Sequence, residues 1–219
     1  MFPGARRSAL QTSPATTLIA GTTALVSALI TLSGAESRAA LIAGFVPASV
    51  TGVVVGPPGI WLAPAWITPL TATLVHGGLL HLGFNLVLLV YCSLLLERTI
   101  GSRLTALLYG VGAYAAAAGQ WAFGPNALVP MVGASGAVSA LVGAYALLFA
   151  QQPVPRIGPI PARAVRIAWL AAAWIAIQLL VGFASGSEGI AIATGAHVGG
   201  FIAGLALARP LLLWRYRRA

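Results

Sequence analysis

The sequence contains no aspartate and no lysine, and only 7% of its 219 residues are charged. Its three acidic residues are glutamates, its twelve basic residues are all arginines, and Cys92 is its single cysteine. So little charge, in a chain that is 59% hydrophobic with a mean hydropathy of +0.94, excludes a water-soluble domain of this size. One cysteine also excludes an internal disulfide. The composition predicts an all-α, polytopic membrane protein that forms one domain over residues 1–219.

The formal net charge of +9 does not indicate a nucleic-acid partner. The arginines are scattered between apolar runs, and no basic patch interleaved with aromatic residues is present. We therefore interpret them as charges that set the topology in a lipid bilayer, and we expect no nucleic acid to bind.

Six apolar stretches are long enough to span a bilayer, at about 20 residues each. Between the first two lies a proline-rich segment, residues 33–78, which is too broken for a span and has Trp61 and Trp66 near its end. Indole rings favour the membrane interface, so we expect a loop that lies there. The predicted spans are Thr16–Leu32, Leu79–Leu96, Leu104–Phe123, Met131–Ala150, Ile167–Phe183 and Ala193–Leu213.

The first stretch has a second interpretation, as a cleaved signal peptide. Arg6 and Arg7 precede its apolar core, and the small residues of SGAES follow it. Because the core is long and the cleavage pattern is loose, we favour a span that is retained.

The arginines predict the orientation. With the N-terminus inside, eleven of the twelve fall on the cytoplasmic side and only Arg38 falls outside. We expect a multi-pass protein of the plasma (inner) membrane with both termini cytoplasmic.

All three histidines occur beside small polar residues at the outer ends of predicted spans. His76, His81 and Asn85 belong to the second, Ser135 to the fourth and His197 to the sixth. Unpaired polar groups are costly in hydrocarbon, and in this orientation the three spans bring theirs to one depth. The pattern predicts a single site in the outer half of the bilayer.

Ser135 and His197 are a nucleophile and a base for acyl transfer, and with no acidic residue in these spans they form a dyad. The segment from Gly133 to Gly136 places the serine in the first turn of its helix. The N–H groups of that turn have no helical partner, so they would stabilise a developing oxyanion. His81 and Asn85, four residues apart on one helix face, donate to the same oxygen. His76 lies about 140° from His81 on a helical wheel, so we expect it to hold structure.

Other interpretations exist for the same residues. Small residues in spans more often mark close helix packing than a catalytic site. Small residues recur on one face of the helix around both Ser135 and His197, which predicts that the fourth and sixth spans pack tightly. Three histidines also suit zinc, but the spacing of His76 and His81 splays them apart and no carboxylate is near to orient them, so we expect no metal and no cofactor. A pump or channel would need acidic relay residues in the spans, and the predicted spans contain none.

The chain resembles the rhomboid family of intramembrane serine proteases. The motifs H-x4-H-x3-N (His76, His81, Asn85), G-x-S-G (Gly133, Ser135, Gly136) and A-H-x-x-G (Ala196, His197, Gly200) carry the resemblance, with the LERTIGS turn after the second span. It covers about Trp66 to Leu213. It implies Ser135 as nucleophile, His197 as base and an oxyanion site from His81, Asn85 and the Ser135 amide, with Gly133, Gly136 and Gly200 structural. It also implies single-span membrane proteins as substrates.

Two positions depart from the family pattern. Ile67 or Thr68 stands where many members have the arginine of a Trp-Arg pair, and Ser139 stands where many have an aromatic residue under the histidine ring. We expect His197 to be less firmly oriented than in such members, or to be held by a ring from elsewhere. The alternative function is a catalytically inactive relative that binds membrane proteins, which would be marked by loss of the serine or histidine.

Overall fold

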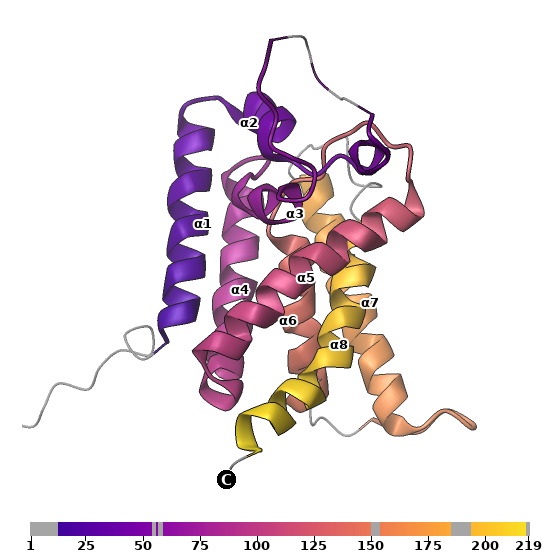
Figure 1. Cartoon of the computed structure of the whole chain (residues 1–219). Helices are drawn as coiled ribbons and strands as arrows, with labels where there is room; N and C mark the ends of the chain where they lie inside the picture. Colours follow the sequence, from indigo (N-terminus) through magenta and orange to yellow (C-terminus); the bar gives the residue numbers. More distant parts are fainter. Residues whose placement is uncertain (1–12, 54–55, 57–58, 150–153, 185–193, 218–219) are drawn as a thin grey trace, which may run out of the picture.

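The computed structural model describes residues 13–53, 56, 59–149, 154–184 and 194–217, and all regular structure within these ranges is helical (Figure 1). Short helices and 3₁₀ turns fill the segment after the first long helix: α2 (Glu36–Ala43), η1 (Pro47–Thr51), α3 (Thr68–Thr71) and η2 (Ala72–Leu74). The long helices are α1 (Pro14–Leu32), α4 (Leu79–Ile100), α5 (Ser102–Phe123), α6 (Ser135–Leu148), α7 (Ala162–Ala184) and α8 (Thr194–Tyr216).

Each of the six predicted stretches falls on one of the long helices, although several ends differ. The prediction that Met131 begins a helix was wrong: α6 begins at Ser135, because Met131 pairs with Phe45 in an antiparallel bridge. Helix α7 begins at Ala162, before the predicted Ile167. The ends predicted at Ala150 and Ala193 lie outside the described residues, as do Arg6, Arg7 and Arg218.

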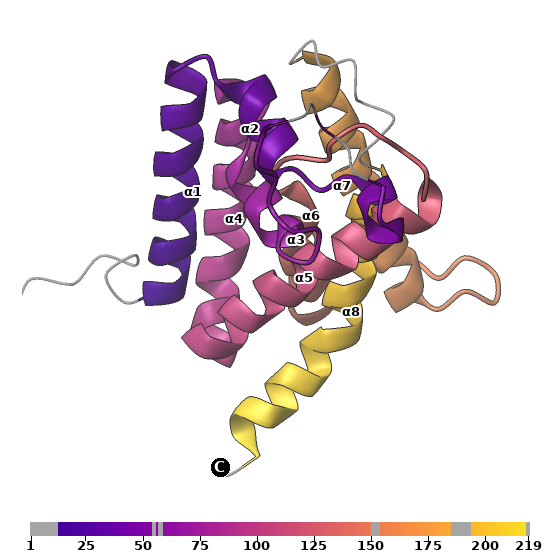
Figure 2. The ribbon, with the colours of Figure 1, turned by 45° about the horizontal axis from the view of Figure 1, so that its top comes forward.

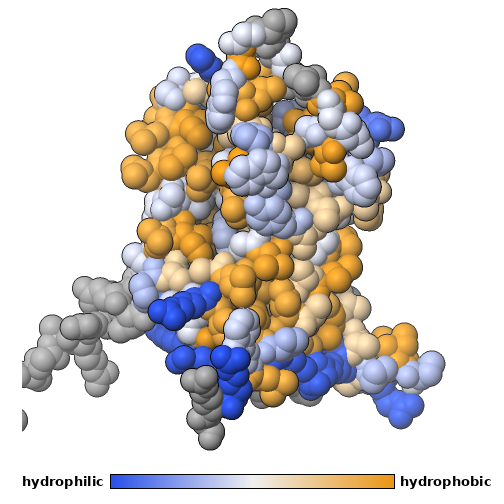
Figure 3. Space-filling model, viewed as in Figure 1, coloured by the Kyte–Doolittle hydropathy of each residue, from blue (hydrophilic) through white to orange (hydrophobic). Residues whose placement is uncertain are grey.

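Among the described residues, α1, α4 and α8 are long and apolar enough to cross a membrane, and α6 is a shorter apolar helix. Hydrophobic residues cover much of the face seen in Figure 3, while hydrophilic residues gather at its lower end. At that end the guanidinium of Arg215 lies against Gly101, and the Tyr216 hydroxyl donates to the Thr99 carbonyl. The protein is an integral membrane protein with a strongly basic end.

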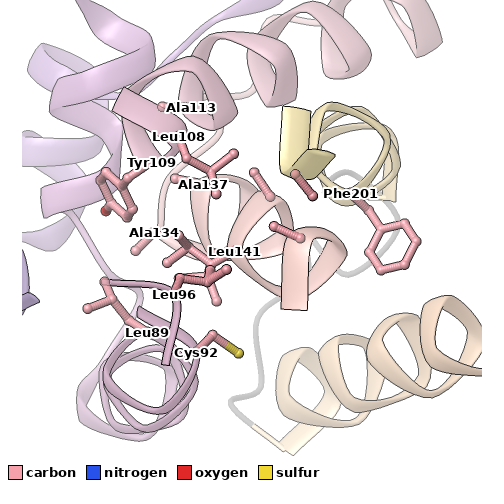
Figure 4. Packing of buried hydrophobic residues seen from close by; sticks show 14 of the residues in the cluster. Leu89, Cys92, Leu96, Leu108, Tyr109, Ala113, Ala134, Ala137, Leu141 and Phe201 are labelled. Atoms are coloured by element: carbon pink, nitrogen blue, oxygen red, sulfur yellow. The ribbon is translucent and has the colours of Figure 1, made fainter. Parts of the chain in front are cut away.

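Helix α6 forms the centre of the bundle. Its buried residues include Ala137, Val138 and Leu141, and α4, α5, α7 and α8 pack around it (Figure 4). Leu89 and Leu96 of α4, Leu108 and Tyr109 of α5, and Phe201 of α8 belong to the same apolar cluster. Side chains from all sides therefore fix the position of the helix that begins with Ser135.

Glycines let α6 and α8 approach until their backbones touch. A Cβ added at Gly204 would lie 2.9 Å from Cα of Ala140, and one at Gly200 would collide with the Gly136 carbonyl oxygen. A Cβ at Gly143 would likewise collide with the Phe201 carbonyl oxygen. Close backbone approach gives dispersion contact where hydrocarbon provides no hydrophobic drive. The expected tight packing of the fourth and sixth stretches is present.

Helix α1 joins the bundle through a buried carboxylate. Glu97, in the last turn of α4, accepts hydrogen bonds from the backbone N–H groups of Ala15 (2.9 Å) and Thr16 (2.8 Å) and from the Thr16 hydroxyl (2.6 Å). These N–H groups belong to the first turn of α1, which has no intrahelical partner for them. A carboxylate at a helix N-terminus also suits the helix dipole.

The segment predicted as an interfacial loop is more ordered than that description implied. Helices α2 and α3, with the described residues between them, cover the end of the bundle where α4 begins (Figure 2). Phe45, Val46 and Ala48 are buried there, whereas Trp61 and Trp66 are exposed. The segment thus contributes core residues as well as exposed indole rings.

We predict that Gly204→Ala destabilises the protein by about 1–3 kcal/mol, the cost of overpacking a close contact. Gly21→Ala is the matched control, since a Cβ at Gly21 meets nothing within 4 Å. It should be neutral or slightly stabilising, because alanine favours helix over glycine by about 1 kcal/mol. Thermal unfolding in detergent compares the two, and equal effects would contradict the packing described.

Candidate functional site

Ser135 and His197 lie against each other at the start of α6 and near the start of α8. The Ser135 Oγ and the His197 Nε2 are 2.9 Å apart, across 62 residues of sequence. Only 5% of Ser135 and 6% of His197 are exposed. The hydroxyl and the imidazole are thus within hydrogen-bond distance in a position shielded from bulk solvent.

The chain enters α6 through a backbone conformation that favours glycine. Gly133 has φ of 107°, and the first bond of the helix runs from the Val138 N–H to the Ala134 carbonyl. The N–H groups of Ser135, Gly136 and Ala137 therefore precede the helical ladder. They have no partner in the helical ladder and lie at the positive end of the helix dipole.

His81 turns one ring nitrogen toward this turn. Its Nδ1 accepts a long hydrogen bond from the Gly77 N–H (3.4 Å), so in the neutral ring the proton is assigned to Nε2. A Cβ added at Gly133 would lie 3.0 Å from that Nε2 and 3.7 Å from the Ser135 Oγ. The His81 ring and the Ser135 hydroxyl therefore both border Gly133.

Asn85 lies one turn after His81 on the same face of α4. Its side-chain Nδ2 donates to the His81 carbonyl at 2.9 Å, a bond that uses one of its two amide hydrogens. The side chain is buried, and its Oδ1 has no partner within the described part of the chain. The amide is held beside His81 with hydrogen-bonding capacity left over.

His76 does not occupy the place expected from a helical wheel. It precedes the first residue of α4, and its ring contacts that of His81 edge to face, with centroids 5.0 Å apart, so the prediction that the two splay apart was wrong. Gly77 and Gly78 separate His76 from the first residue of α4. His76 is therefore outside the helix, and the angle read from a helical wheel does not apply to it. Among the described residues, no three histidine, cysteine, aspartate or glutamate side chains group closely enough to hold a metal ion.

His76 instead joins α1 to the turn before the serine. Its Nε2 accepts from the Ala134 N–H at 3.2 Å, which assigns its proton to Nδ1. That Nδ1 donates to the Ser27 hydroxyl at 2.8 Å, and Ser27 donates to the Leu74 carbonyl at 2.7 Å. Each donor in the series has an acceptor, and the backbone next to Ser135 is fixed by it.

The two glycines of the remaining motifs lie in the helix contacts. A Cβ at Gly136 would meet Ala116 of α5, and Gly200 lies on the Gly136 carbonyl. The first turn of α8 is held by Gln120, whose Oε1 accepts from the Ala196 N–H at 3.3 Å. Backbone contact and one amide thus fix the position of His197.

Sequence reasoning missed three of the residues around the site. Trp174 contacts His197 and bonds to Ser139, Gln120 holds Ala196, and Ser27 holds His76. Their signals were visible: tryptophan in mid-span, glutamine in an apolar run, and polar or small residues on one face of the first stretch (Thr16, Ala20, Thr23, Ser27). Buried polar groups require partners, so such residues point inward.

The model of the Rhomboid domain family matches residues 63–214, more than half of the chain. The match includes every residue of the site described above except Ser27. A search of curated proteins gave no match.

We predict that Gly133→Ala disrupts the site more than it disrupts the fold. The substitution places a side chain in a left-handed conformation, at about 1–2 kcal/mol, and its Cβ displaces the His81 ring. The rate at which a fluorophosphonate labels Ser135 should fall at least about tenfold, because small displacements of reacting groups are costly. Gly83→Ala, with open space around its Cβ, is the control; equal labelling of both variants would contradict this geometry.

Proposed function

The chain belongs to the rhomboid family, and on this premise we propose that it is an intramembrane serine endopeptidase acting on single-span membrane proteins. The proposed nucleophile is Ser135 and the proposed general base is His197. No cofactor is needed for this chemistry.

The distance of 2.9 Å between the Ser135 Oγ and the His197 Nε2 is the observation that supports this proposal best. His197 takes the hydroxyl proton as Ser135 attacks the scissile carbonyl, and the imidazolium then gives that proton to the leaving amine. A water molecule, deprotonated by the same imidazole, hydrolyses the acyl-enzyme and regenerates the serine.

The oxyanion of the tetrahedral intermediate has three donors nearby in this proposal: the Nε2–H of His81, the amide of Asn85 and the Ser135 N–H. The tautomer assigned to His81 supports its role, because it leaves a proton on the Nε2 that borders Gly133, two residues before the serine. Preorganised donors of this kind contribute most when water is excluded, as the burial of Asn85 and Ser135 favours.

The whole chain, residues 1–219, acts in this proposal as one domain with six membrane spans: α1, α4, α5, α6, α7 and α8. Helix α6 has 14 residues and is about 21 Å long, shorter than the hydrocarbon core of about 30 Å, which favours a nucleophile recessed from the surface. The basic end of the bundle, with Arg98, Arg103 and Arg215, is then cytoplasmic, as are both termini, in the plasma membrane. Labelling of single cysteines from either side of the membrane tests this orientation.

Ser135→Ala and His197→Ala should each abolish cleavage of single-span substrates by the purified protein in liposomes. Removal of either group from a serine protease lowers kcat by about 10⁶-fold. Ser33→Ala, at an exposed serine after α1, is the control and should cleave like wild type. Thermal unfolding establishes that the variants are folded; cleavage by folded Ser135→Ala would sink the proposal, and an inactive wild type would favour a protein that binds membrane proteins.

His81→Ala and Asn85→Ala should each lower kcat by about 10- to 1000-fold, the range found when one oxyanion donor is lost. His76→Ala should act differently, by lowering thermal stability, because it leaves the Ala134 N–H and Ser27 without their partner. If His76→Ala reduced turnover more than His81→Ala in equally stable proteins, the assigned roles would be reversed.

A further inference from the structure

Trp174 of α7 contacts the proposed base and is linked through Ser139 to the helix of the proposed nucleophile. Its indole ring meets the His197 imidazole edge to face, with ring centroids 6.3 Å apart and an interplanar angle of 66°. Its Nε1–H donates a short hydrogen bond of 2.5 Å to the Ser139 hydroxyl. The ring is 3% exposed although it stands in mid-helix, so it faces the bundle and not the lipid.

Ser139 connects this indole to the nucleophile. It lies one turn after Ser135, is fully buried, and donates its hydroxyl hydrogen to the Ser135 carbonyl at 2.7 Å. Its oxygen accepts the hydrogen bond from Trp174, so the single donor of the indole and the hydroxyl of the serine are both satisfied. The indole is therefore fixed at its polar end to the helix that carries Ser135, while its ring adjoins the base.

Two small residues, Gly200 and Ser139, pack against each other where α8 meets α6. Gly200, three residues after His197, lies against Ser139, where an added Cβ would be 3.1 Å from the Ser139 Cβ. Because Gly200 has no side chain and Ser139 has a small one, neither presents a ring to the imidazole. Trp174 presents one from a third helix, and edge-to-face pairs of aromatic rings have a preferred geometry that restricts rotation.

We propose that Trp174 is a positioning residue: its ring sets the orientation of the His197 imidazole, and its bond to Ser139 sets that ring relative to the nucleophile helix. The inference rests on the proposed serine protease function. It extends that function, because the reactivity of Ser135 and His197 then depends on α7, a helix that carries neither residue.

The test compares five variants with wild type in liposomes: Trp174→Leu, Trp174→Phe, Ser139→Ala, Ser139→Tyr and the double variant Trp174→Leu/Ser139→Tyr. Trp169→Leu is the matched control, since it makes the same change on an exposed face of the same helix. The readouts are kcat, KM, the rate of fluorophosphonate labelling of Ser135, and thermal unfolding.

Trp174→Leu should lower kcat and the labelling rate by about 10- to 100-fold with KM within about twofold, because a misplaced base affects the chemical step. Trp174→Phe keeps a ring but loses the N–H, and Ser139→Ala removes its acceptor, so both should lose less activity than Trp174→Leu. In the double variant a tyrosine one turn after Ser135 occupies the vacated space and should restore part of kcat. Ser139→Tyr alone should overpack against Trp174 and lose stability.

Three outcomes would overturn the inference: kcat of Trp174→Leu equal to that of Trp169→Leu, loss of thermal stability with kcat retained, or no rescue by Ser139→Tyr. Failure of the proposed function has a different signature, a wild type that neither cleaves nor is labelled. In that case a crystal structure of Trp174→Leu still decides. Displacement of the His197 ring from Ser135 supports the inference, and an unchanged ring position refutes it.

Discussion

The close backbone contact between α6 and α8 is the constraint on which the site depends. Ser135 and His197 come from segments 62 residues apart, and no covalent or metal link between them is present in the described part of the chain. Glycines at 143, 200 and 204 remove the side chains that would separate the two helices. In lipid, helices associate through dispersion contacts and hydrogen bonds, because the hydrophobic effect does not drive them together. The contact between α6 and α8 therefore fixes the distance between the Ser135 hydroxyl and the His197 imidazole as well as the fold.

The polar groups near the serine form connected series that reach the surrounding helices. One runs from α1 through Ser27 and His76 to the Ala134 N–H, and another from α7 through Trp174 and Ser139 to the Ser135 carbonyl. Both end on the backbone on either side of the serine hydroxyl. Because each hydrogen-bonded group is costly to leave unpaired in a low-dielectric interior, these series make the first turn of α6 rigid from two directions.

Much of this arrangement could be predicted from the sequence, for identifiable reasons. Apolar runs define helices because backbone groups in hydrocarbon must bond within their own segment, and the family resemblance, now confirmed, indicated the site residues. The start of α6 was placed too early because Met131 and Val132 are as apolar as the helix, while the bridge to Phe45 that excludes them from it is non-local. The position of His76 and the contacts of Trp174 depend on tertiary packing, which hydropathy and spacing do not encode. A ring from elsewhere was one of two expectations at Ser139, and although the tryptophan in mid-span was visible, nothing in the sequence indicated that its ring meets His197.

The carboxylate of Glu97 has a consequence for the order in which the protein is assembled. The first turn of α1 enters its environment long before its partner, which lies 82 residues further along the chain. Without α4, the N–H groups of Ala15 and Thr16 have no acceptor within their own helix and require one from water. When α4 inserts, its glutamate replaces the water and becomes buried in the same step. The N-terminal turn of α1 and the buried carboxylate of α4 thus satisfy each other, and neither has this partner until both helices are present.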